Sequence, residues 1–338
     1  MDLRDSDEEA AFRAGLRRWL REHLPGGGQP EHSWSVDELK VWSKRLHEAG
    51  YAGLTWPVAY GGQGHPPSFQ AIYAEESALA GAPDHLNVIG MNMVGPTLVA
   101  HGTAAQQARF LPGILSGDIL FCQGFSEPGA GSDLASVRTR ATLDGDAYVI
   151  EGEKVWSSYA HLADFCLLLA RTNSDGPKHQ GLTCFILDMR APGVSVRPLR
   201  QLSGESDFNQ IILDGARIPA EHVVGEPGQG WGVALSTLAH ERGTFGITLT
   251  ARLTVQFQRL LATVHACAAA QDPVVRREVA ELYVRLQGLR YTGYRALSAL
   301  AASGQPGPES AILKLEWSLT HQRLCSPSAE KRCTRALP

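Results

Sequence analysis

The hydrophobic residues of this chain change their spacing twice, and these two changes restrict the folds that it can adopt. Up to about residue 117, apolar residues recur at intervals of three and four, which is typical of helices. Between about residues 118 and 225 they alternate with polar residues or form short runs between turn residues, which indicates strands. From residue 226 the helical spacing returns. We therefore expect an α+β fold with a helical, a β and a second helical part.

Local signals predict where the elements of these parts begin. Ser6 and Ser35 each precede acidic residues and an apolar helical pattern, as helix N-caps do. Asp272 followed by Pro273 is a start signal for another helix, because proline is favoured at the first helical position. The predicted helices cover about residues 6–24, 35–49, 68–80, 92–100, 104–116, 231–264, 273–302 and 311–325.

The segment ATLDGDAYVIEGEKVWSS places Asp-Gly between alternating apolar residues, which predicts a hairpin. We assign a helical N-terminal domain to residues 1–117, an antiparallel, β-barrel-like middle domain to 118–225 and a helical bundle to 226–325. The remaining segment, 326–338, is polar, basic and without a period. It follows a helix that stops while still amphipathic, so we interpret it as a truncated or frame-shifted C-terminus. A disordered tail is the alternative.

Composition excludes several classes of function. The formal net charge is −4 and charges of both signs are mixed, so no basic stripe for nucleic acid is present. No apolar run is long enough to span a membrane, and the acidic, amphipathic N-terminus is unlike a signal or transit peptide. The six cysteines are scattered without metal-ligand spacing. We expect a cytoplasmic protein without a metal site.

Three features could carry chemistry. The first is the stretch FCQGFSEPGAGSDLAS, in which small residues would let backbone amides approach a flat or anionic ligand. It lacks the GxGxxG, GKS/T and GxSxG patterns of nicotinamide, P-loop and hydrolase sites. A tight polar turn at a domain boundary is the simpler interpretation when this loop is taken alone.

The other two features lie further along the chain. Trp156 is followed by two serines at a strand end, where it could wall an aromatic cofactor or belong to the core. Glu241 and Arg242 lie on a largely apolar predicted helix. A carboxylate there is costly to bury unless it is paired, and desolvation would raise its pKa and suit it to proton abstraction. An exposed Glu-Arg pair is an equally good interpretation of that feature alone.

Taken together, FCQGFSEPGAGSDLAS, GEKVWSSYAHLAD and FNQIILDGARIPAEHVVGEPGQGWGVALSTLAHER strongly resemble the acyl-CoA dehydrogenase family, from about residue 7 to residue 323. The resemblance implies a helical domain, a β domain and a four-helix bundle, with FAD bound between the last two. It also implies oxidation of an acyl-CoA to the trans-2-enoyl-CoA in fatty acid or lipid catabolism. An electron-transfer flavoprotein would accept the electrons, and the chain would form homo- or hetero-oligomers.

The resemblance also implies roles for single residues. The candidate FAD contacts are Phe125, Ser126, Gly131, Ser132, Trp156 and Ser158. Ser132 would in addition contact the pantetheine arm of the substrate. Family members carry the catalytic base either late in the bundle or just before an arginine on the long helix. We therefore expect Glu241 to be the base that removes the α-proton and Arg242 to support it.

The chain also departs from the family pattern. The usual Arg-x-x-Phe-Gly flavin segment is not evident in the bundle. In its place stands LLATVHACAAAQDPVVRREVAELY, which resembles the sequences of an actinobacterial branch of the family. That branch includes members that act on bulky or unusual acyl-CoAs and members that pair with a second, different subunit. The atypical ending favours a second hypothesis, a non-catalytic or defective subunit of a heteromeric dehydrogenase. A flavin monooxygenase on the same fold is a third, which Glu241 argues against.

Overall fold

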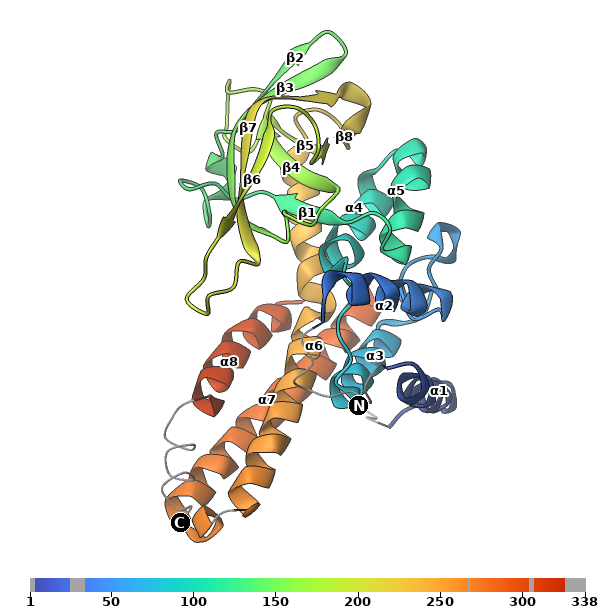
Figure 1. Cartoon of the computed structure of the whole chain (residues 1–338), viewed down its shortest axis with the longest axis vertical. Helices are drawn as coiled ribbons and strands as arrows, with labels where there is room; N and C mark the ends of the chain where they lie inside the picture. Colours follow the sequence, from blue (N-terminus) through green and yellow to red (C-terminus); the bar gives the residue numbers. More distant parts are fainter. Residues whose placement is uncertain (1–3, 25–33, 267, 304–306, 326–338) are drawn as a thin grey trace. The chain divides into compact units, whose positions relative to one another are not determined.

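The computed structural model describes residues 4–24, 34–266, 268–303 and 307–325 (Figure 1). Two compact units make up the chain. The sheet unit comprises Trp34–Gly64 and Asp84–His240, and the bundle unit comprises Met1–Ser33, His65–Pro83 and Glu241–Pro338. Helices, then strands, then helices follow one another along the chain, so the predicted α+β fold is confirmed. The segment 326–338, which we interpreted as a truncated or frame-shifted end, lies outside the described residues.

The helices begin close to where the sequence predicts. Ser6 and Ser35 each accept a hydrogen bond from a backbone N–H three residues on and form capping boxes with Glu9 and Glu38. The helical elements are α1 (Asp7–His23), α2 (Val36–Glu48), η2 (Val58–Tyr60), α3 (Pro67–Ala80), η3 (Gly90–Val94), α4 (Gly95–His101), α5 (Ala104–Ser116), η4 (Leu134–Ser136), η5 (Ala220–His222), α6 (Gly230–Ala266), η6 (Ala268–Gln271), α7 (Pro273–Ser303) and α8 (Glu309–Leu324).

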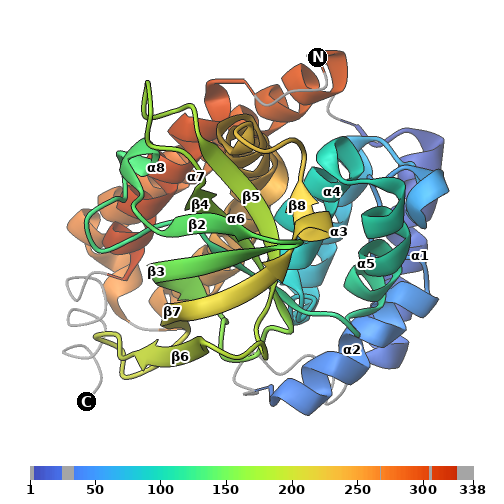
Figure 2. The ribbon, with the colours of Figure 1, turned by 90° about the horizontal axis from the view of Figure 1, so that it is seen from above.

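The sheet unit contains an eight-stranded sheet in the order β6-β7-β3-β2-β4-β5-β8, with β1 paired to β4. Figure 2 shows β2, β3 and β7 side by side. Pairing is antiparallel as expected, except where β4 pairs in parallel with β1 and β2. The strands are β1 (Phe121–Gly124), β2 (Arg140–Asp144), β3 (Ala147–Ser158), β4 (Phe165–Arg171), β5 (Leu182–Asp188), β6 (Val194–Leu199), β7 (Phe208–Pro219) and β8 (Val223–Val224).

The predicted hairpin forms between β2 and β3. Asp144 pairs with Ala147, and Gly145 turns the chain with a φ of 66°. A side chain would disfavour this backbone angle, so the Asp-Gly signal reports a real steric requirement. The fold of this segment therefore follows from local sequence.

One predicted helix differs in its first turn. We expected it to start at about residue 92, but it begins at Gly90 as a π-helix, in which the N–H of Gly95 bonds to the carbonyl of Gly90. Pro96 follows and has no N–H to continue the pattern. Trp56 instead donates its indole N–H to the Met91 carbonyl at 3.2 Å. A distant tryptophan thus satisfies a backbone group that the helix leaves free.

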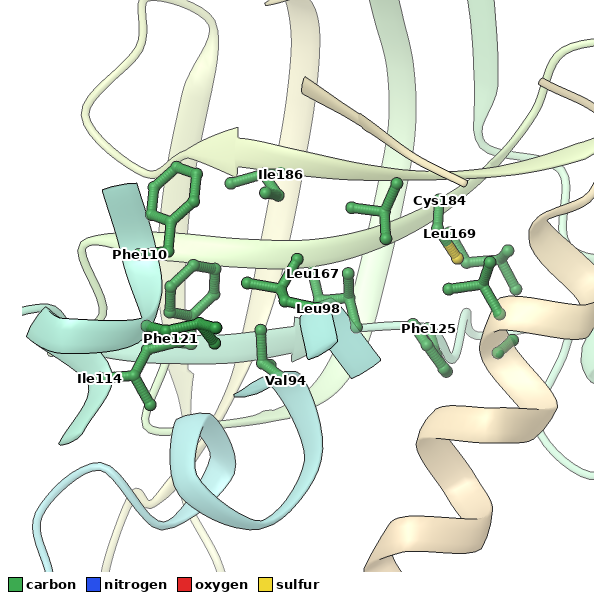
Figure 3. Packing of buried hydrophobic residues seen from close by; sticks show 14 of the residues in the cluster. Val94, Leu98, Phe110, Ile114, Phe121, Phe125, Leu167, Leu169, Cys184 and Ile186 are labelled. Carbon is green, nitrogen blue, oxygen red and sulfur yellow. The ribbon is translucent and has the colours of Figure 1, made fainter. Parts of the chain in front are cut away.

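The core of the sheet unit has two layers. Strands β4 and β5 are buried on both faces, so their side chains alternate between two clusters. Leu167 and Leu169 of β4 face one cluster together with Phe110 and Ile114 of α5 (Figure 3). The cluster on the other face contains Cys166, Leu168 and Phe185. This packing fixes β1, whose carboxyl end leads into residues 126–133, SEPGAGSD, which we call the glycine-serine loop.

The bundle unit joins α1 and α3 to the later helices. Side chains of α6, α7 and α8 form one apolar cluster, which includes Leu253, Leu286 and Leu313. A second cluster joins Ala71 and Ala74 of α3 to Ile247 of α6 and Leu297 of α7. Asp272 accepts a hydrogen bond from the N–H of Val274, so the start signal predicted for α7 is confirmed.

Candidate active site

The glycine-serine loop leaves the sheet at the end of β1. Glu127 and Ala130 exchange two backbone hydrogen bonds of 2.9 and 3.0 Å, with Pro128 and Gly129 at the tip. The N–H of Val155 in β3 donates to the Ser126 carbonyl at 2.9 Å. The loop is therefore fixed at its base to the strand that carries Trp156.

A buried ion pair holds the loop from below. Lys154 is fully buried, and its ammonium donates to Glu127 Oε1 at 2.8 Å and to the Phe125 carbonyl at 3.1 Å. Glu127 also accepts the backbone N–H groups of Arg138 at 2.7 Å and Thr139 at 2.9 Å. One carboxylate thus satisfies the ammonium and two amides.

The electrostatics of this pair follow from burial. Burial alone would raise the pKa of Glu127, but the charge of Lys154 and the hydrogen bonds outweigh it, so the pKa lies below its ordinary value of 4.5. Burial lowers the pKa of Lys154, and the charge of Glu127 opposes this shift. Removing one partner of such a pair costs about 3–5 kcal/mol, because a charge is left buried alone.

The outer side of the loop is open. Gly129, Gly131 and Ser132 are exposed, and a Cβ added at either glycine would meet no atom within 4 Å. Asp133, which follows, is anchored by Lys178 at 2.7 Å and by the Ser136 hydroxyl at 2.5 Å. A flat group could therefore approach the backbone here.

Trp156 lies in a β-bulge of β3. Pairing with β7 shifts register between Lys154 and Ser157, and Trp156 has a φ of 63°. This angle is rare for a bulky residue and costs roughly 1–3 kcal/mol. The side chain is nevertheless 61% exposed, and its one described ring contact is with Phe208 at 6.3 Å. A strained, exposed tryptophan beside the loop suits a surface that stacks on a ligand.

The structure brings most of the predicted residues together. Ser126 and Ser158 are half-buried, whereas Phe125 is buried in the core, so only its backbone can reach a ligand. Glu241 and Arg242 lie within α6, but their side chains are outside the described residues. Their positions relative to the loop therefore stay a prediction.

Buried polar atoms near the loop were not found by sequence analysis. Gln123 Nε2, Ser157 Oγ and Asn209 Oδ1 have no hydrogen-bond partner in the described part of the chain. Gln123 lies in β1, two residues before Phe125, and Ser157 follows Trp156. No sequence pattern indicates which polar side chains remain unpaired, because that depends on their neighbours in space.

A cavity of the sheet unit, of about 720 Å³, lies at the start of α6. His179 and Trp231 form one wall, with their rings 4.8 Å apart at 61°. Gly228 and Gly232 also line the cavity, and the N–H of Gly228 donates to Thr183 Oγ1. No pattern in the sequence around Trp231 indicates this cavity, because residues 172–181 and 227–232, which line it, come together only in the fold.

Metal-binding clusters and membrane-spanning helices are absent from residues 4–24, 34–266, 268–303 and 307–325. No group of three histidine, cysteine or carboxylate side chains there could hold a metal ion. None of these helices is long and apolar enough to cross a membrane. Cys122, Cys166 and Cys184 are buried free thiols.

Family models match three successive parts of the chain. The N-terminal domain of acyl-CoA dehydrogenase matches residues 6–118, the middle domain residues 122–215 and the C-terminal domain residues 228–330. A curated relative, acyl-CoA dehydrogenase IpdE1 of Mycobacterium tuberculosis, is 40% identical over 321 residues, covering 93% of this chain and 83% of that protein.

Solved structures show the same similarity. The Tcur3481–Tcur3483 steroid ACAD is 34% identical with a TM-score of 0.84, covering 96% of this chain and 84% of that chain. The ChsE4–ChsE5 complex from Mycobacterium tuberculosis is 29% identical with a TM-score of 0.81, covering 96% and 85%. Each of these two structures contains two proteins with different names.

Proposed function

This chain belongs to the acyl-CoA dehydrogenase family, and from this premise we propose that Glu241 removes the α-proton of a bound acyl-CoA while its β-hydride passes to FAD. The product is the trans-2-enoyl-CoA. The observation that carries the proposal is the glycine-serine loop, fastened by Glu127 and Lys154 beside the exposed, strained Trp156. Such strain persists where the surroundings impose it and is frequent at functional sites.

The loop and the strand end would hold the cofactor. Ser126, Ser132 and Ser158 offer hydroxyl groups, Gly131 offers an open backbone, and Trp156 offers an exposed ring. When bound, FAD supplies the hydride acceptor. The hydroxyl and amide donors of the loop would stabilise negative charge that develops beside them.

Proton abstraction falls to Glu241. The α-proton of a thioester is weakly acidic, so the base must have its pKa raised toward neutrality by an apolar environment. Leu238, three residues before Glu241 and therefore on the same face of α6, is a partly buried apolar neighbour. Arg242, next in the chain, would position Glu241 or the thioester carbonyl.

The cavity at the start of α6 would take part of the CoA. The rings of His179 and Trp231 can flank a planar base. The N-terminus of α6 at Gly230 favours a negatively charged phosphate. Ser132, on the exposed side of the loop, would contact the pantetheine arm.

The relatives support proposals for the substrate and the partners. The structure at 34% identity is called a steroid ACAD, which supports a bulky, ring-bearing acyl group for this chain. Two relatives were solved with a second protein, which supports assembly with a different subunit. An electron-transfer flavoprotein would reoxidise the cofactor. The paired relatives also favour the second hypothesis, in which this chain is the non-catalytic subunit.

A spectroscopic titration separates the two hypotheses. Purified protein loaded with FAD should show the flavin band near its usual visible wavelengths, and an oxidisable acyl-CoA should bleach it. Glu241→Gln should keep the band but lose at least about 100-fold in the rate of bleaching, the contribution typical of general-base catalysis. Glu281→Gln, an exposed change on α7 outside the loop, the proposed base and the cavity at the start of α6, is the control and should bleach as the unmodified protein does. Equal bleaching rates in Glu241→Gln and the unmodified protein would remove Glu241 as the base.

A further inference from the structure

Residues 156–159 at the end of β3, which we call the strained turn, begin and end with a left-handed backbone angle. Trp156 has a φ of 63° and Tyr159 a φ of 55°, and they are the non-glycine residues with positive φ in the described part of the chain. Such angles are rare for bulky residues and persist only where surrounding contacts impose them. The two side chains are 61% and 42% exposed, so their own packing supplies only part of these contacts. Hydrogen bonds to the backbone are the other contacts that can impose both angles.

Both ends of the strained turn are fixed by backbone hydrogen bonds. The N–H of Val155, just before the turn, donates to the Ser126 carbonyl of the glycine-serine loop at 2.9 Å. The N–H of Tyr159, at its end, donates to the Asp207 carbonyl at 2.7 Å. The turn is therefore fixed on one side to the glycine-serine loop and on the other to the segment that precedes β7.

Asn209 contacts the middle of the strained turn from β7, the strand next to β3 (Figure 2). It is the register partner of Ser157, and its side chain is fully buried. Its Nδ2 lies 3.2 Å from the Ser157 carbonyl, 3.2 Å from the Asp207 carbonyl and 3.1 Å from His161 Nδ1. Carbonyl oxygens only accept hydrogen bonds, so the amide nitrogen and not the amide oxygen must face them. Its two hydrogens are shared among the three acceptors.

These three contacts connect the strained turn with the chain on either side of it. The Ser157 carbonyl belongs to the turn itself, and His161 follows the turn in the sequence. The Asp207 carbonyl is the same group that accepts the N–H of Tyr159. One buried side chain therefore fixes the turn, the segment after it and the acceptor that holds its last residue.

The strength of these contacts is sufficient for that role. The net contribution of two such hydrogen bonds to stability is of the same order as the cost of one left-handed angle at a bulky residue. Removing the donor would also leave buried carbonyl groups with fewer partners, which is a further cost. The hydrogen bonds of Asn209 can therefore offset the strain at Trp156 or at Tyr159.

We propose that Asn209 is a positioning residue for the flavin, because it maintains the strained turn that presents the Trp156 ring and the Ser158 hydroxyl. Asn209 acts through these two residues and does not itself contact a ligand, since its side chain is fully buried. This inference rests on the proposed FAD site, but its first consequence, the position of Trp156, concerns the protein without flavin. A merely structural role for Asn209 would change the stability of the chain and not the position of one exposed ring.

The first test observes Trp156 in the flavin-free full chain labelled with 5-fluorotryptophan. Its fluorine NMR signal is identified as the one that disappears in Trp156→Phe. Asn209→Asp replaces the amide nitrogen that faces the three acceptors by an oxygen, so it should shift or broaden this signal. Asn87→Asp makes the same exchange at another buried asparagine of the sheet unit, whose Nδ2 donates to the Ile119 carbonyl at 2.7 Å. This control should leave the Trp156 signal in place.

The second test measures the dissociation constant of FAD by equilibrium dialysis, at a temperature at which circular dichroism shows each variant to be folded. Asn209→Asp should weaken FAD binding at least about 10-fold more than Asn87→Asp does. Asn209→Ser adds no charge and keeps one hydrogen-bond donor, so it tests the same contacts if Asn209→Asp does not fold. It should give a smaller shift of the Trp156 signal and a smaller loss of FAD affinity.

Two results would overturn the proposal. The first is an unchanged Trp156 signal in the folded variants of Asn209, and the second is a loss of FAD affinity no larger than that of Asn87→Asp. If the unmodified chain bound no FAD, the proposed function itself would fail. The fluorine spectra would then still decide whether Asn209 maintains the strained turn.

Discussion

His85 shows how a single buried ring couples the sheet unit to pH. Its Nδ1 accepts the N–H of Asn87 at 3.1 Å, so its Nε2 carries the proton and donates to the Leu115 carbonyl at 3.1 Å. Protonation at Nδ1 would break the first of these bonds. Burial, the largest cause, lowers the pKa of His85 from 6.5 to about 4.

The sign of the resulting pH dependence follows from linkage. The unfolded chain binds a proton near pH 6.5, whereas the folded chain does so only near pH 4, so protons favour unfolding between these values. Stability from this group is complete above pH 6.5 and is lost as pH falls toward 4. The loss amounts to at most about 3 kcal/mol.

We expect His85→Gln to remove this part of the acid sensitivity. Urea unfolding at pH 7.5 and at pH 4.5 measures it, and the difference between the two free energies should shrink in the variant. His265→Gln, which changes an exposed histidine in the last turn of α6, serves as the control and should keep the full difference. An unchanged pH difference in His85→Gln would contradict the assignment.

At the residue scale, the sequence predicts groups whose partners are local. Ser6, Ser35 and Asp272 were identified as caps because their partners lie two or three residues away. Lys154 and Glu127 were not paired in advance, since the pairing joins residues far apart in the chain. Tertiary packing decides which oppositely charged side chain a buried lysine or glutamate contacts.

The bulge of β3 is the element that most departs from regular geometry. Trp156 adopts a left-handed backbone angle that glycine would adopt without strain, and its side chain is largely exposed. Little packing is lost if it is removed. The backbone of β3 is therefore strained at Trp156, and the bulge places the tryptophan ring on the surface.

Trp156→Gly should accordingly separate stability from cofactor binding. In flavin-free protein the free energy of unfolding should stay the same or rise by up to about 1 kcal/mol, because glycine relieves the strain. The amount of FAD retained per chain should fall. Urea unfolding followed by circular dichroism and the visible absorbance of the loaded protein measure the two effects.

Leu143→Gly is the matched control for that change. Leu143 is 58% exposed in β2, and its φ is not positive. Glycine there should lower the free energy of unfolding by about 0.5–1 kcal/mol and leave FAD retention unchanged. If Trp156→Gly destabilises the chain as much as or more than Leu143→Gly, the bulge is not strained.

At the element scale, the sequence indicated the strand but not its bulge. The alternation in ATLDGDAYVIEGEKVWSS predicts β2 and β3, and Trp156 was expected at a strand end. No residue there requires a positive φ, unlike Gly145 in the hairpin. The sequence did not predict the π-helix at Gly90 either, because this helix depends on a hydrogen bond from Trp56, which lies far away in sequence.

The division into two units is a property of the whole chain. Helices α1 and α3 join the later helices in the bundle unit, whereas α2, α4 and α5 belong to the sheet unit. The sequence predicted a single helical stretch over residues 1–117, because periodicity shows which segments are helical but not which helices pack together. Domain boundaries at 117 and 225 stay a proposal.

Two units should respond separately to damage in one of them. Lys154→Met leaves Glu127 buried without its partner and should destabilise the sheet unit by about 3–5 kcal/mol. We expect faster amide hydrogen exchange in β1, β3 and β4 and unchanged exchange in α7. Mass spectrometry of peptides from the exchanged protein measures this.

The double variant Glu127→Gln/Lys154→Met provides the control for that experiment. It removes both charges and should recover part of the lost protection, because no lone buried charge remains. A uniform acceleration across β4 and α7 in Lys154→Met would instead mean that the chain opens as a single cooperative block.

The anchoring of the glycine-serine loop also bears on protein engineering. Glu127 binds the backbone of Arg138 and Thr139 as well as Lys154, and Lys154 binds the carbonyl of Phe125. The shape of the loop therefore depends on its own sequence and also on Lys154 of β3 and the backbone of Arg138 and Thr139. If SEPGAGSD is transplanted onto another sheet, an equivalent of Lys154 and of the two backbone amides must be included. Without them, the new protein will not hold the loop in its present shape.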